Sequence, residues 1–397
     1  MIRRNFIRIA GGGVVAGALA AGTSGCGWSG DFPAVALEAW QGPASDAELR
    51  RWALSYAILA PNSHNRQPWL VDLAEPQAIT LYVDRERMLP MTDPWFRQIV
   101  VSQGTFLESL VMALRERGVE PKVLLFPEGE FKPREVDERP VARISWDAKP
   151  GQPAARKDLL FAQLLLRNTA KIDYVTTRTV PASMLAALQS AYADASVKFG
   201  GTVDAAALEP LRAICWESAK VELGTSRTVM ESLQLTRIGP AEIARHRDGI
   251  SVNAVVPRLA AAIGAFDRSR PPAPGSNGYQ QMMSRFEGHS KTAMGFVWLS
   301  TATAKHLTDG TSRSAEINAG RAYLRLQLKA TELGLQIHPM SQAPQEFPEM
   351  KTFYDKLHLQ LVGKPATEET VQMFCRMGYC AAQQHSPRRS LAGFVKA

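Results

Sequence analysis

The chain has 397 residues, 45% of them hydrophobic, so it can bury a substantial core as one large domain or as two smaller ones. The formal net charge is +8, but the lysines and arginines are scattered and never form a run of five. This pattern argues against nucleic-acid binding. No apolar run after residue 30 reaches the roughly 20 residues that a membrane span needs.

Residues 1–35 have the composition of an export signal followed by a linker. Arginines at positions 3, 4 and 8 flank the start of a mildly apolar run of small residues that ends near Ala21. Residues 3–7, a paired arginine followed by an aromatic and an aliphatic residue, resemble the twin-arginine consensus. We therefore expect export by the twin-arginine route, which carries chains that have already folded.

Two ways of processing this segment stay open. The residues before Cys26 resemble a lipoprotein cleavage box, although Thr23 stands where an aliphatic residue is usual. A diacylglycerol and a further acyl chain at Cys26 would anchor the protein firmly to a membrane. The alternative is ordinary cleavage around residues 18–21. The expected location is the periplasm, or the cell envelope by way of a lipid anchor.

Residues 36–150 are predicted to form a first half that mixes helices and strands. Ser45 and Glu48 make a capping box that predicts the start of a helix, which stops at Pro61. A long helix is predicted over residues 94–117, closed by Gly118. The predicted strands of this half are residues 69–73, 78–83, 122–126 and 141–146.

Residues 147–156, rich in Pro, Ala and Lys, are the predicted joint to a second half, residues 151–397. Helices are predicted at 157–168, 181–195 and 315–333, the last capped by Gly334, and a strand at 373–379. The stretch 265–290 is interpreted as a surface connection or, alternatively, as a lid. This mixture predicts an α+β fold with antiparallel-dominated sheets flanked by helices.

The four cysteines are Cys26, Cys215, Cys375 and Cys380, and none of them forms a CxxC pair. Zinc and iron–sulfur sites therefore have little support, and no metal is predicted. If the segment around Cys375 is a strand, Cys375 and Cys380 point to opposite faces, so a disulfide between them is not expected. We interpret the three cysteines after Cys26 as small buried hydrophobic residues.

Four segments carry chemistry. In the first, residues 60–69, a helix ends in a turn dense with short polar side chains and backbone N–H groups, which can hydrogen-bond a ribityl chain or a flavin edge. In the second, residues 167–171, two cations and a hydroxyl suit a phosphate. The third, residues 334–342, is a loop after a capped helix that offers backbone donors. The fourth, residues 386–390, is a cationic tail.

In this order, the segments resemble the nitroreductase family of flavoproteins. The pattern Ala-Pro-x-x-x-Asn-x-Gln-Pro-Trp at residues 60–69 is the most recognisable motif of that family, and residues 167–171 resemble its Arg-x-Ser-x-Arg/Lys motif. The helix ending before residue 336, the strand at 374–379 and the tail resemble later elements of the family. Arg247-Asp248-Gly249, downstream of residues 230–237, points to a duplicated, Acg-like branch. The resemblance covers most of residues 45–395 in pieces.

The resemblance implies two nitroreductase-like halves fused in one chain. Ordinary members are homodimers in which one subunit supplies the phosphate motif, the loop and the tail, and the other supplies the turn. Here the first half keeps the turn but lacks the phosphate motif, and the second half keeps the phosphate motif, loop and tail but lacks the turn. We therefore expect a monomer that acts as an intramolecular pseudo-dimer, with one FMN site and a degenerate second site.

Residue roles follow from the resemblance alone. Arg389, with Arg388 beside it, is assigned to the FMN phosphate. Asn168 is either a ligand or a helix-surface residue. His64 and His338 flank the expected site and could donate protons, but they are interpreted first as positional or packing residues. The remaining assigned residues are Arg167, Thr169 and Lys171 for the phosphate, Pro61, Asn62, Ser63 and Asn65 for the ribityl chain and ring, and the backbone of Pro339, Met340 and Ser341 for N5 and O4.

The resemblance implies an FMN-dependent oxidoreductase that reduces nitroaromatic or quinone-like acceptors by two electrons. The flavin performs the chemistry, so no catalytic side chain is predicted. The electron donor, NAD(P)H or another reductant, stays open because the chain is expected to be exported. The alternative is a non-catalytic FMN-binding or sequestering protein whose flavin is occluded. An inert structural lipoprotein is disfavoured by the four segments.

Overall fold

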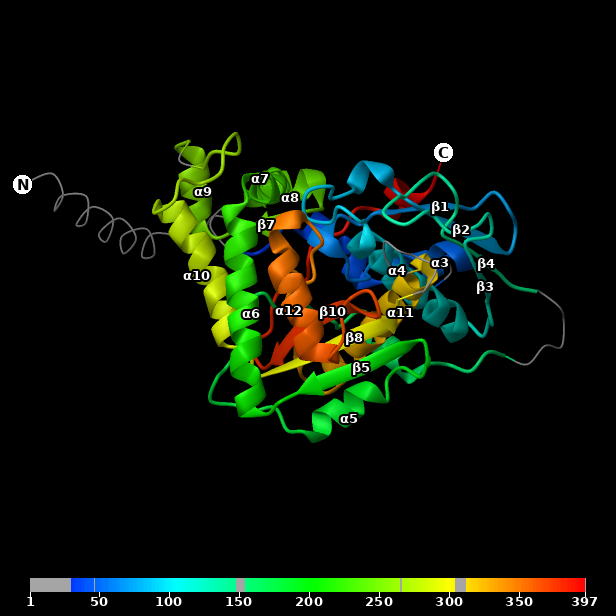
Figure 1. Cartoon of the computed structure of the whole chain (residues 1–397). Coiled ribbons are helices and arrows are strands. Elements are labelled where there is room, and N and C mark those ends of the chain that lie inside the picture. Colours follow the sequence, from blue (N-terminus) through cyan, green and yellow to red (C-terminus); the bar gives the residue numbers. More distant parts are fainter. Residues whose placement is uncertain (1–29, 46, 148–153, 265, 304–311, 397) are drawn as a thin grey trace, which may run out of the picture.

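A computed structural model describes residues 30–45, 47–147, 154–264, 266–303 and 312–396 (Figure 1). The predicted export signal and Cys26 lie outside the described residues. Two four-stranded antiparallel sheets and the helices around them make up the body of the molecule. The predicted α+β class, with antiparallel sheets flanked by helices, is confirmed. Among the described residues, no helix is both long and apolar enough to cross a membrane.

The first half forms the sheet with strand order β1-β2-β4-β3. The helix α4 lies between its second and third strands in sequence. The elements of this half are α2 Ala34–Leu37, η1 Glu38–Gln41, α3 Leu49–Ala57, η2 Ser63–Asn65, β1 Trp69–Asp72, β2 Ala78–Val83, η3 Arg85–Arg87, α4 Arg97–Glu116, β3 Lys122–Leu125 and β4 Ala142–Ser145.

The second half forms the sheet with strand order β5-β8-β10-β9, so its first, second, fourth and third strands are neighbours, as in the first half. The helix α11 again lies between the second and third strands in sequence. The elements of this half are η4 Leu159–Gln163, α5 Ser183–Gln189, β5 Val197–Thr202, β8 Gly295–Ala302, α11 Arg313–Glu332, β9 Gln336–Pro339, η5 Pro348–Met350, α12 Lys351–Val362, β10 Glu369–Gly378 and η6 Leu391–Phe394.

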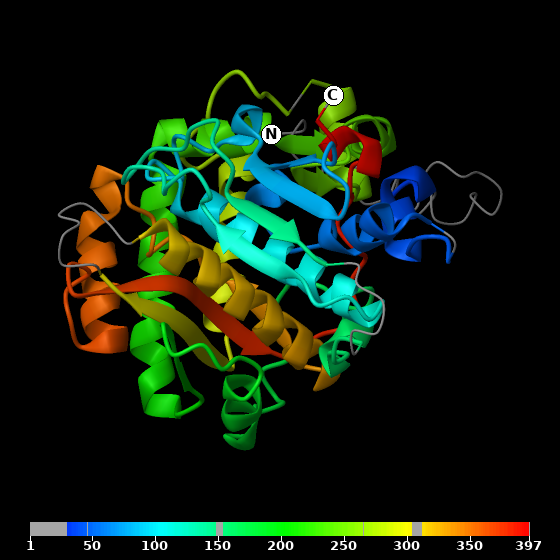
Figure 2. The ribbon, with the colours of Figure 1, turned by 90° about the vertical axis from the view of Figure 1, so that its right-hand side faces the viewer.

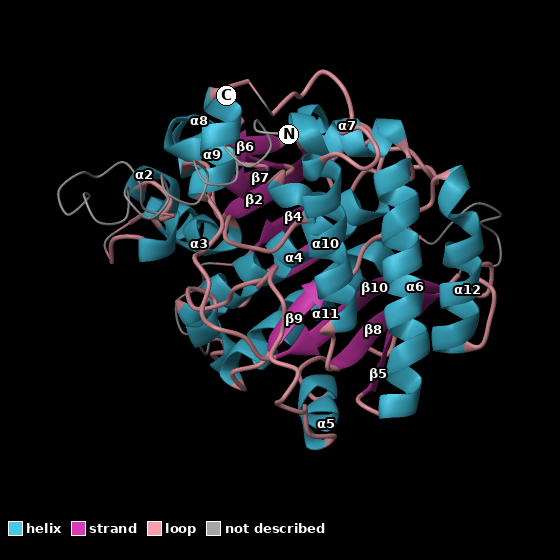
Figure 3. Cartoon of the chain, turned by 90° about the vertical axis from the view of Figure 1, so that its left-hand side faces the viewer, coloured by secondary structure: helices cyan, strands magenta, loops and turns pink. Residues whose placement is uncertain are grey.

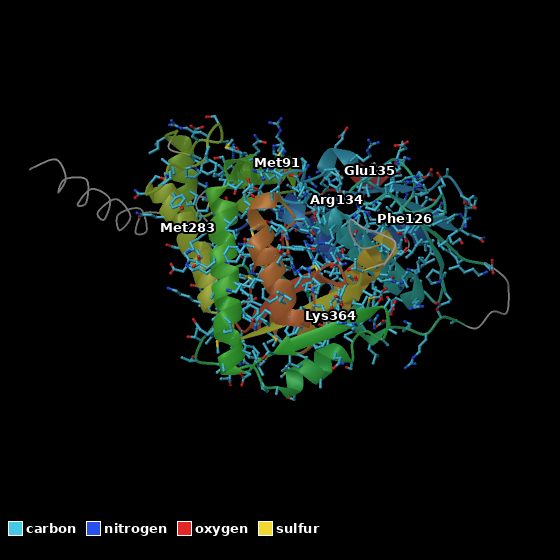
Figure 4. All side chains as sticks on the ribbon, viewed as in Figure 1. Met91, Phe126, Arg134, Glu135, Met283 and Lys364 are labelled. Carbon is cyan, nitrogen blue, oxygen red and sulfur yellow. The ribbon has the colours of Figure 1, made fainter. Side chains whose placement is uncertain are left out.

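The halves differ by an insert between β5 and β8. It lies at one end of the molecule, where Met283 is labelled, away from Phe126 and Arg134 of the first half (Figures 1 and 4). The strands β6 and β7 of the insert form a separate parallel pair. The insert consists of α6 Ala205–Gly224, α7 Ser226–Gln234, β6 Thr236–Ile238, α8 Gly239–His246, β7 Ile250–Val252, α9 Val255–Ala262 and α10 Asn277–Lys291.

The helices α4 and α11 cross at two glycines, Gly104 and Gly320. A Cβ atom added to Gly104 would lie 2.0 Å from the carbonyl oxygen of Ile317, and one added to Gly320 would lie 2.0 Å from that of Val101. The two backbones therefore touch directly, which only glycine permits. The two long helices run side by side between the sheets (Figure 2).

Each of these helices begins with a buried arginine that reaches the other half. Arg97 donates from Nη1 to the carbonyl of Gln372 and pairs with Glu346. Arg313 donates from Nη2 to the carbonyl of Trp95, 3.0 Å away. The spacing from Arg97 to Gly104 is repeated from Arg313 to Gly320. The interface between the halves is thus built from matching positions of two matching helices.

The C-terminal tail returns from the second half to the first. Val395 forms a parallel bridge with Val71 of β1, and the N–H of Lys396 donates to the carbonyl of Val71 at 2.8 Å. Phe394 is fully buried in the core of the first half. Figure 2 shows this tail beside the first sheet. The tail therefore carries residues 386–390 to the turn at residues 60–69.

Several predicted helix bounds are wrong. The helix α3 begins at Leu49 rather than after Ser45, because the Glu48 side chain itself accepts from the N–H groups of Arg50 and Arg51 and caps the helix. Residues 157–168 contain only the short 3-10 helix η4, and the predicted helix at 181–195 shrinks to α5. The predicted boundary between the halves, near residue 150, falls among residues that the structure does not describe and stays a prediction.

Candidate functional site

The turn after α3 is backbone-strained. His64, Asn65 and Gln67 all have positive φ angles, of 48°, 52° and 52°, although none of them is glycine. Such conformations cost on the order of 1–3 kcal/mol each and persist only when the surroundings enforce them, as they do at ligand-binding sites. A specific set of contacts must therefore hold this turn.

Most polar side chains of the turn hold the turn itself. Oδ1 of Asn62 accepts from the N–H of Gln67 at 2.7 Å, and Oγ of Ser63 donates to Oε1 of Gln98 at 3.1 Å. The carbonyl of Pro61 accepts from the hydroxyl of Thr105. The N–H groups of Ser63, Asn65, Arg66 and Gln67 also donate within the chain, so the turn leaves few of its donors for a ligand.

Asn65 and Arg388 join the turn to the tail. The Asn65 amide donates to the carbonyl of Pro387 at 3.0 Å and its oxygen accepts from Nη1 of Arg388 at 2.6 Å. Arg388 also donates to the carbonyls of Ile58, Leu59 and Ala60 at the end of α3. A cation at a helix C-terminus is favourable because the carbonyls there carry partial negative charge. The side chain of Asn65 is therefore already engaged.

Arg167 lies beside Arg388. Its Nη2 donates to the carbonyl of Leu59, and both guanidinium groups lie over the indole of Trp40, at 5.3 and 5.2 Å. Nε of Arg167 is buried and has no hydrogen-bond partner. Burial lowers the pKa of Arg167 to about 10, and burial followed by the charge of Arg167 lowers the pKa of Arg388 further. Two cations are thus held together against their mutual repulsion.

Lys171 and Arg285 extend this group of cations. Desolvation by the surrounding protein lowers the pKa of Lys171 to about 8, with contributions from the charges of Arg285 and Arg388. Much of the Lys171 surface remains open to solvent, as expected for a group in a concave site. Within the described ranges, none of Arg167, Lys171, Arg285 and Arg388 pairs with a carboxylate. We call these four residues the cation cluster.

The other basic and polar residues of the motifs lie apart from this cluster or are engaged. Arg389 donates to the carbonyl of Gln67 at 2.9 Å, stacks on Phe394 and lies 3.8 Å from Asp84, on the opposite side of the turn. Asn168 donates to the carbonyls of residues 383 and 384 in the tail. Thr169 makes no side-chain hydrogen bond with any described residue.

The loop after α11 continues as β9 and its N–H groups are partly used. The N–H of Met340 donates to the carbonyl of Phe374 at 2.8 Å, and the Met340 side chain is buried in the core around α12. Pro339 has no N–H to offer, since it is an imino acid. Of the three residues assigned to N5 and O4, only Ser341 therefore keeps a backbone N–H without a hydrogen bond to the described residues.

His338, next to Pro339, is held by a buried arginine. Nε of Arg376 donates to Nδ1 of His338 at 3.0 Å, and its other nitrogens donate to the carbonyls of Ile172 and His289. Burial, followed by the charge of Arg376, lowers the pKa of His338 well below its usual value. The ring is therefore neutral with its proton on Nε2, which has no partner among the described residues. His338 is therefore a fixed hydrogen-bond donor as well as a packed side chain.

His64, by contrast, is fully engaged. Its Nδ1 lies 3.3 Å from the hydroxyl of Ser63 and its Nε2 lies 3.3 Å from the hydroxyl of Ser232 on α7. Burial lowers its pKa to about 4, so the ring is neutral at physiological pH. These contacts agree with a positional role for His64.

The insert covers the turn and explains the Arg247–Gly249 motif. The N–H of Gly249 donates to the carbonyl of Asn65, and the amide of Gln67 donates to the carbonyl of Arg247. Gly249 has φ +71°, and a Cβ there would lie 2.2 Å from the carbonyl of Leu235. The motif therefore holds the strained turn in place through two hydrogen bonds to backbone groups of the insert.

Sequence reasoning missed Arg285, Trp40 and Arg376. Arg285 lies on α10, in the stretch interpreted as a connection or lid, and lines a cavity of about 560 Å³. The other residues that line this cavity are Asp173, Asn277, Gln280, Gln281 and Ser284. No local motif marks Arg285, since only the fold brings its charge near Lys171. Within the described part of the chain, no cluster of side chains suits a metal ion.

No protein-family model matches the chain. Its sequence is similar to two Mycobacterium tuberculosis proteins named as candidate NAD(P)H nitroreductases. Rv3131 is 36% identical over 94 residues, 22% of this chain and 27% of the relative. Acg is 29% identical over 123 residues, 31% of this chain and 34% of the relative. The matched stretches span about a third or less of either relative.

Solved structures similar to this one include a candidate nitroreductase from Anabaena variabilis, with TM-score 0.40, 10% identity and coverage of 87% of this chain and 91% of that one. A nitroreductase with bound FMN from Bacteroides fragilis has TM-score 0.32 and 16% identity, and the match covers 61% of this chain and 99% of that one. An FMN-dependent nitroreductase from Mycobacterium smegmatis, in complex with NADPH, has TM-score 0.34 and 16% identity. That match covers 59% of this chain and 97% of the other.

Proposed function

We propose that this chain is an FMN-dependent oxidoreductase of the nitroreductase type that reduces nitroaromatic or quinone-like acceptors by two electrons. The observation that carries the proposal is the cation cluster, which has no carboxylate partner among the described residues and meets a strained turn from the other half of the chain. A phosphate monoester is the ligand that neutralises such a group through charge-assisted hydrogen bonds.

The residues present fit an FMN phosphate. Arg167 offers a buried Nε and Thr169 a hydroxyl, neither of which has a hydrogen-bond partner among the described residues. Lys171 offers an ammonium group whose lowered pKa a bound anion would raise again. His338 offers a neutral N–H at the end of β9, suited to a carbonyl or ring nitrogen. When bound, FMN supplies the redox chemistry, and these side chains bind and orient it.

The names of the sequence relatives support the same reaction class, with NAD(P)H as electron donor. The repeated strand order and the matching helices α4 and α11 support an internal duplication, so that the single chain acts as a pseudo-dimer. The turn comes from one half, and Arg167, Lys171 and His338 come from the other. One complete FMN site per chain follows from this division.

The test is the visible spectrum of the purified full chain. We expect a yellow protein with one FMN per chain that bleaches when NADPH is added without oxygen and regains colour with a quinone. A protein that stays colourless and does not take up added FMN would rule the proposal out.

A non-catalytic FMN-binding protein is the second candidate, favoured by the covering of the turn by the insert. Ser232 of α7 contacts His64, and Gly249 contacts Asn65. Under this alternative, the protein is yellow but NADPH does not bleach it within minutes. Shortening the insert would then expose the flavin and restore reduction.

We also propose that the chain is exported by the twin-arginine route, to the periplasm or to the cell envelope through a lipid at Cys26. The support is the sequence of residues 3–8 and the residues before Cys26. Replacing Arg3 and Arg4 by lysine should leave the protein in the cytoplasm on fractionation. Unchanged export of that variant would show that another route is used.

A further inference from the structure

The helix α9 carries an apolar face that no described part of the chain covers. Val255, Val256, Leu259 and Ile263 recur at helical spacing, so they share one side of this helix. Their exposed fractions are 37%, 62%, 44% and 80%, and none of the residues of α9 is buried. Contiguous exposed apolar patches of this kind mark sites of contact with a partner or a membrane.

Other large apolar side chains are also exposed, but they are dispersed. Leu159 lies on η4, Val175 follows the second half's phosphate motif, and Leu359 lies on α12. Apolar residues scattered singly over a surface are normal and need no explanation. The face of α9 differs because its four members lie on adjoining turns of one helix.

The position of α9 points to its occupant. The side chain of Asn253, two residues before α9, donates to the carbonyl of Asp31. The first described residues therefore lie beside the start of α9, and α2, which follows them, lies near α8 in Figure 3. Cys26 precedes Asp31 by five residues, which span at most about 18 Å when fully extended. A membrane that holds Cys26 would therefore lie within that distance of Asp31, which contacts the residue two positions before α9.

The charges around α9 favour an anionic surface. Between residues 245 and 270 the chain has five arginines and two aspartates, and three of these arginines pair with carboxylates: Arg247 with Glu38, Arg268 with Glu242 and Arg270 with Asp267. Arg258 is the only charged residue of α9 itself, and Arg245 on the neighbouring α8 is exposed. Basic residues that border an apolar helix face are attracted to anionic headgroups. With eight residues, α9 is too short to span a bilayer, so it can only lie in its interface.

We propose that α9 is a membrane-contact helix whose apolar face lies in the interfacial layer of an anionic phospholipid bilayer while the N-terminal segment holds the chain there. This contact would fix the orientation of the insert against the membrane. It does not depend on flavin binding, so it can fail or succeed independently of the proposed reaction.

The experiment is hydrogen exchange of the full chain with and without vesicles of phosphatidylcholine and phosphatidylglycerol in a 7:3 ratio. We expect exchange in residues 255–263 to slow when vesicles are added. The double variant Leu259→Asp, Ile263→Asp should abolish this protection and weaken vesicle binding at least about tenfold, since it removes the apolar contact area.

Leu359→Asp is the matched control, because Leu359 is 59% exposed on α12 and lies outside the proposed contact. It should leave both the protection of α9 and vesicle binding unchanged, and circular dichroism should confirm that all variants fold. Unchanged exchange of α9 with vesicles overturns the proposal. Slow exchange of residues 255–263 in the absence of vesicles also overturns the proposal. If that slow exchange depends on protein concentration, a second copy covers the apolar face. If it does not, the chain's own N-terminal residues cover it.

Discussion

After α4, Gly118 takes a φ of +77° and the chain continues into β3; after α11, Gly334 takes a φ of +66° and the chain continues into β9. Four residues beyond each glycine the halves differ. Lys122 is solvent-exposed and pairs with Asp147 at 2.7 Å. His338 is buried and held by Arg376 at 3.0 Å. The same backbone course therefore ends in a surface ion pair in one half and in a fixed hydrogen-bond donor in the other.

The difference comes from what covers each strand. Both strands lie at the edge of their sheets. Alternate residues of β3 are exposed, whereas β9 lies beside Arg376, which the end of α10 holds through the carbonyl of His289. Burial removes water as a competing partner. The neutral imidazole of His338 and the cation cluster therefore keep their hydrogen-bonding capacity for a ligand. The two sheets share one strand order, but the third strand of each in sequence is packed differently.

The largest expected effect tests whether the halves pack through matching glycines. Gly104→Val or Gly320→Val should prevent folding or cost more than about 4 kcal/mol, because the new side chain meets the facing backbone. Urea unfolding measures this cost. Gly224→Ala, where nothing lies within 4 Å, is the control and should change stability by less than about 1 kcal/mol. Tolerance of valine at both positions would mean that the helices do not touch there.

The buried arginines at the helix starts come next. Arg97→Met should cost about 3–5 kcal/mol in the free energy of unfolding, because it leaves the carboxylate of Glu346 buried without its cation. Arg313→Met should also be costly, by about 1–3 kcal/mol, because it removes the buried hydrogen bonds that Arg313 donates to the carbonyls of Trp95 and Glu135. Arg85→Met, which breaks the exposed pair with Glu138, is the control and should cost at most about 1 kcal/mol. If all three variants lost the same free energy of unfolding, the contacts of Arg97 and Arg313 with the other half would not be what stabilises the protein.

All four residues of the cation cluster come from the second half, so removing them tests whether this half binds the FMN phosphate. Arg167→Ala with Lys171→Ala should weaken FMN binding at least about tenfold for each of the two side chains removed, since charge-assisted hydrogen bonds contribute roughly 1.5–3 kcal/mol. Fluorescence titration of FMN measures this affinity. Lys122→Ala in the first half is the matched control and should leave the affinity unchanged. The site is misplaced if the double variant retains FMN as the parent chain does.

The smallest effect is a pH dependence. Because the pKa of Lys171 is lowered to about 8, its ammonium is present below that pH and lost above it. Since phosphate binding favours the charged form, FMN affinity should fall about tenfold between pH 7 and pH 9. Lys171→Arg stays charged in this range and should flatten the profile. A parent chain whose affinity is constant up to pH 9 would show that Lys171 does not contact the phosphate.

The sequence by itself determined the local elements with strong patterns. The spacing of apolar residues predicted α4, α11 and most strands, and the motifs at residues 60–69, 167–171 and 386–390 marked the segments that meet. It did not give the start of α3, because Glu48 and Ser45 are both acceptable caps and only the backbone geometry chooses between them. It also overestimated the helix at 157–168, where packing leaves a single 3-10 turn.

The tertiary structure decided which polar groups are free. Asn65 accepts from Arg388, Arg389 donates to the carbonyl of Gln67, and the N–H of Met340 donates to β10. Nε2 of His338, by contrast, has no partner among the described residues. The physical reason is that a sequence motif fixes residue type and spacing, whereas the partner of each donor depends on segments hundreds of residues away. Local patterns therefore marked the segments proposed for the site, and long-range packing decided which of their donors are already engaged.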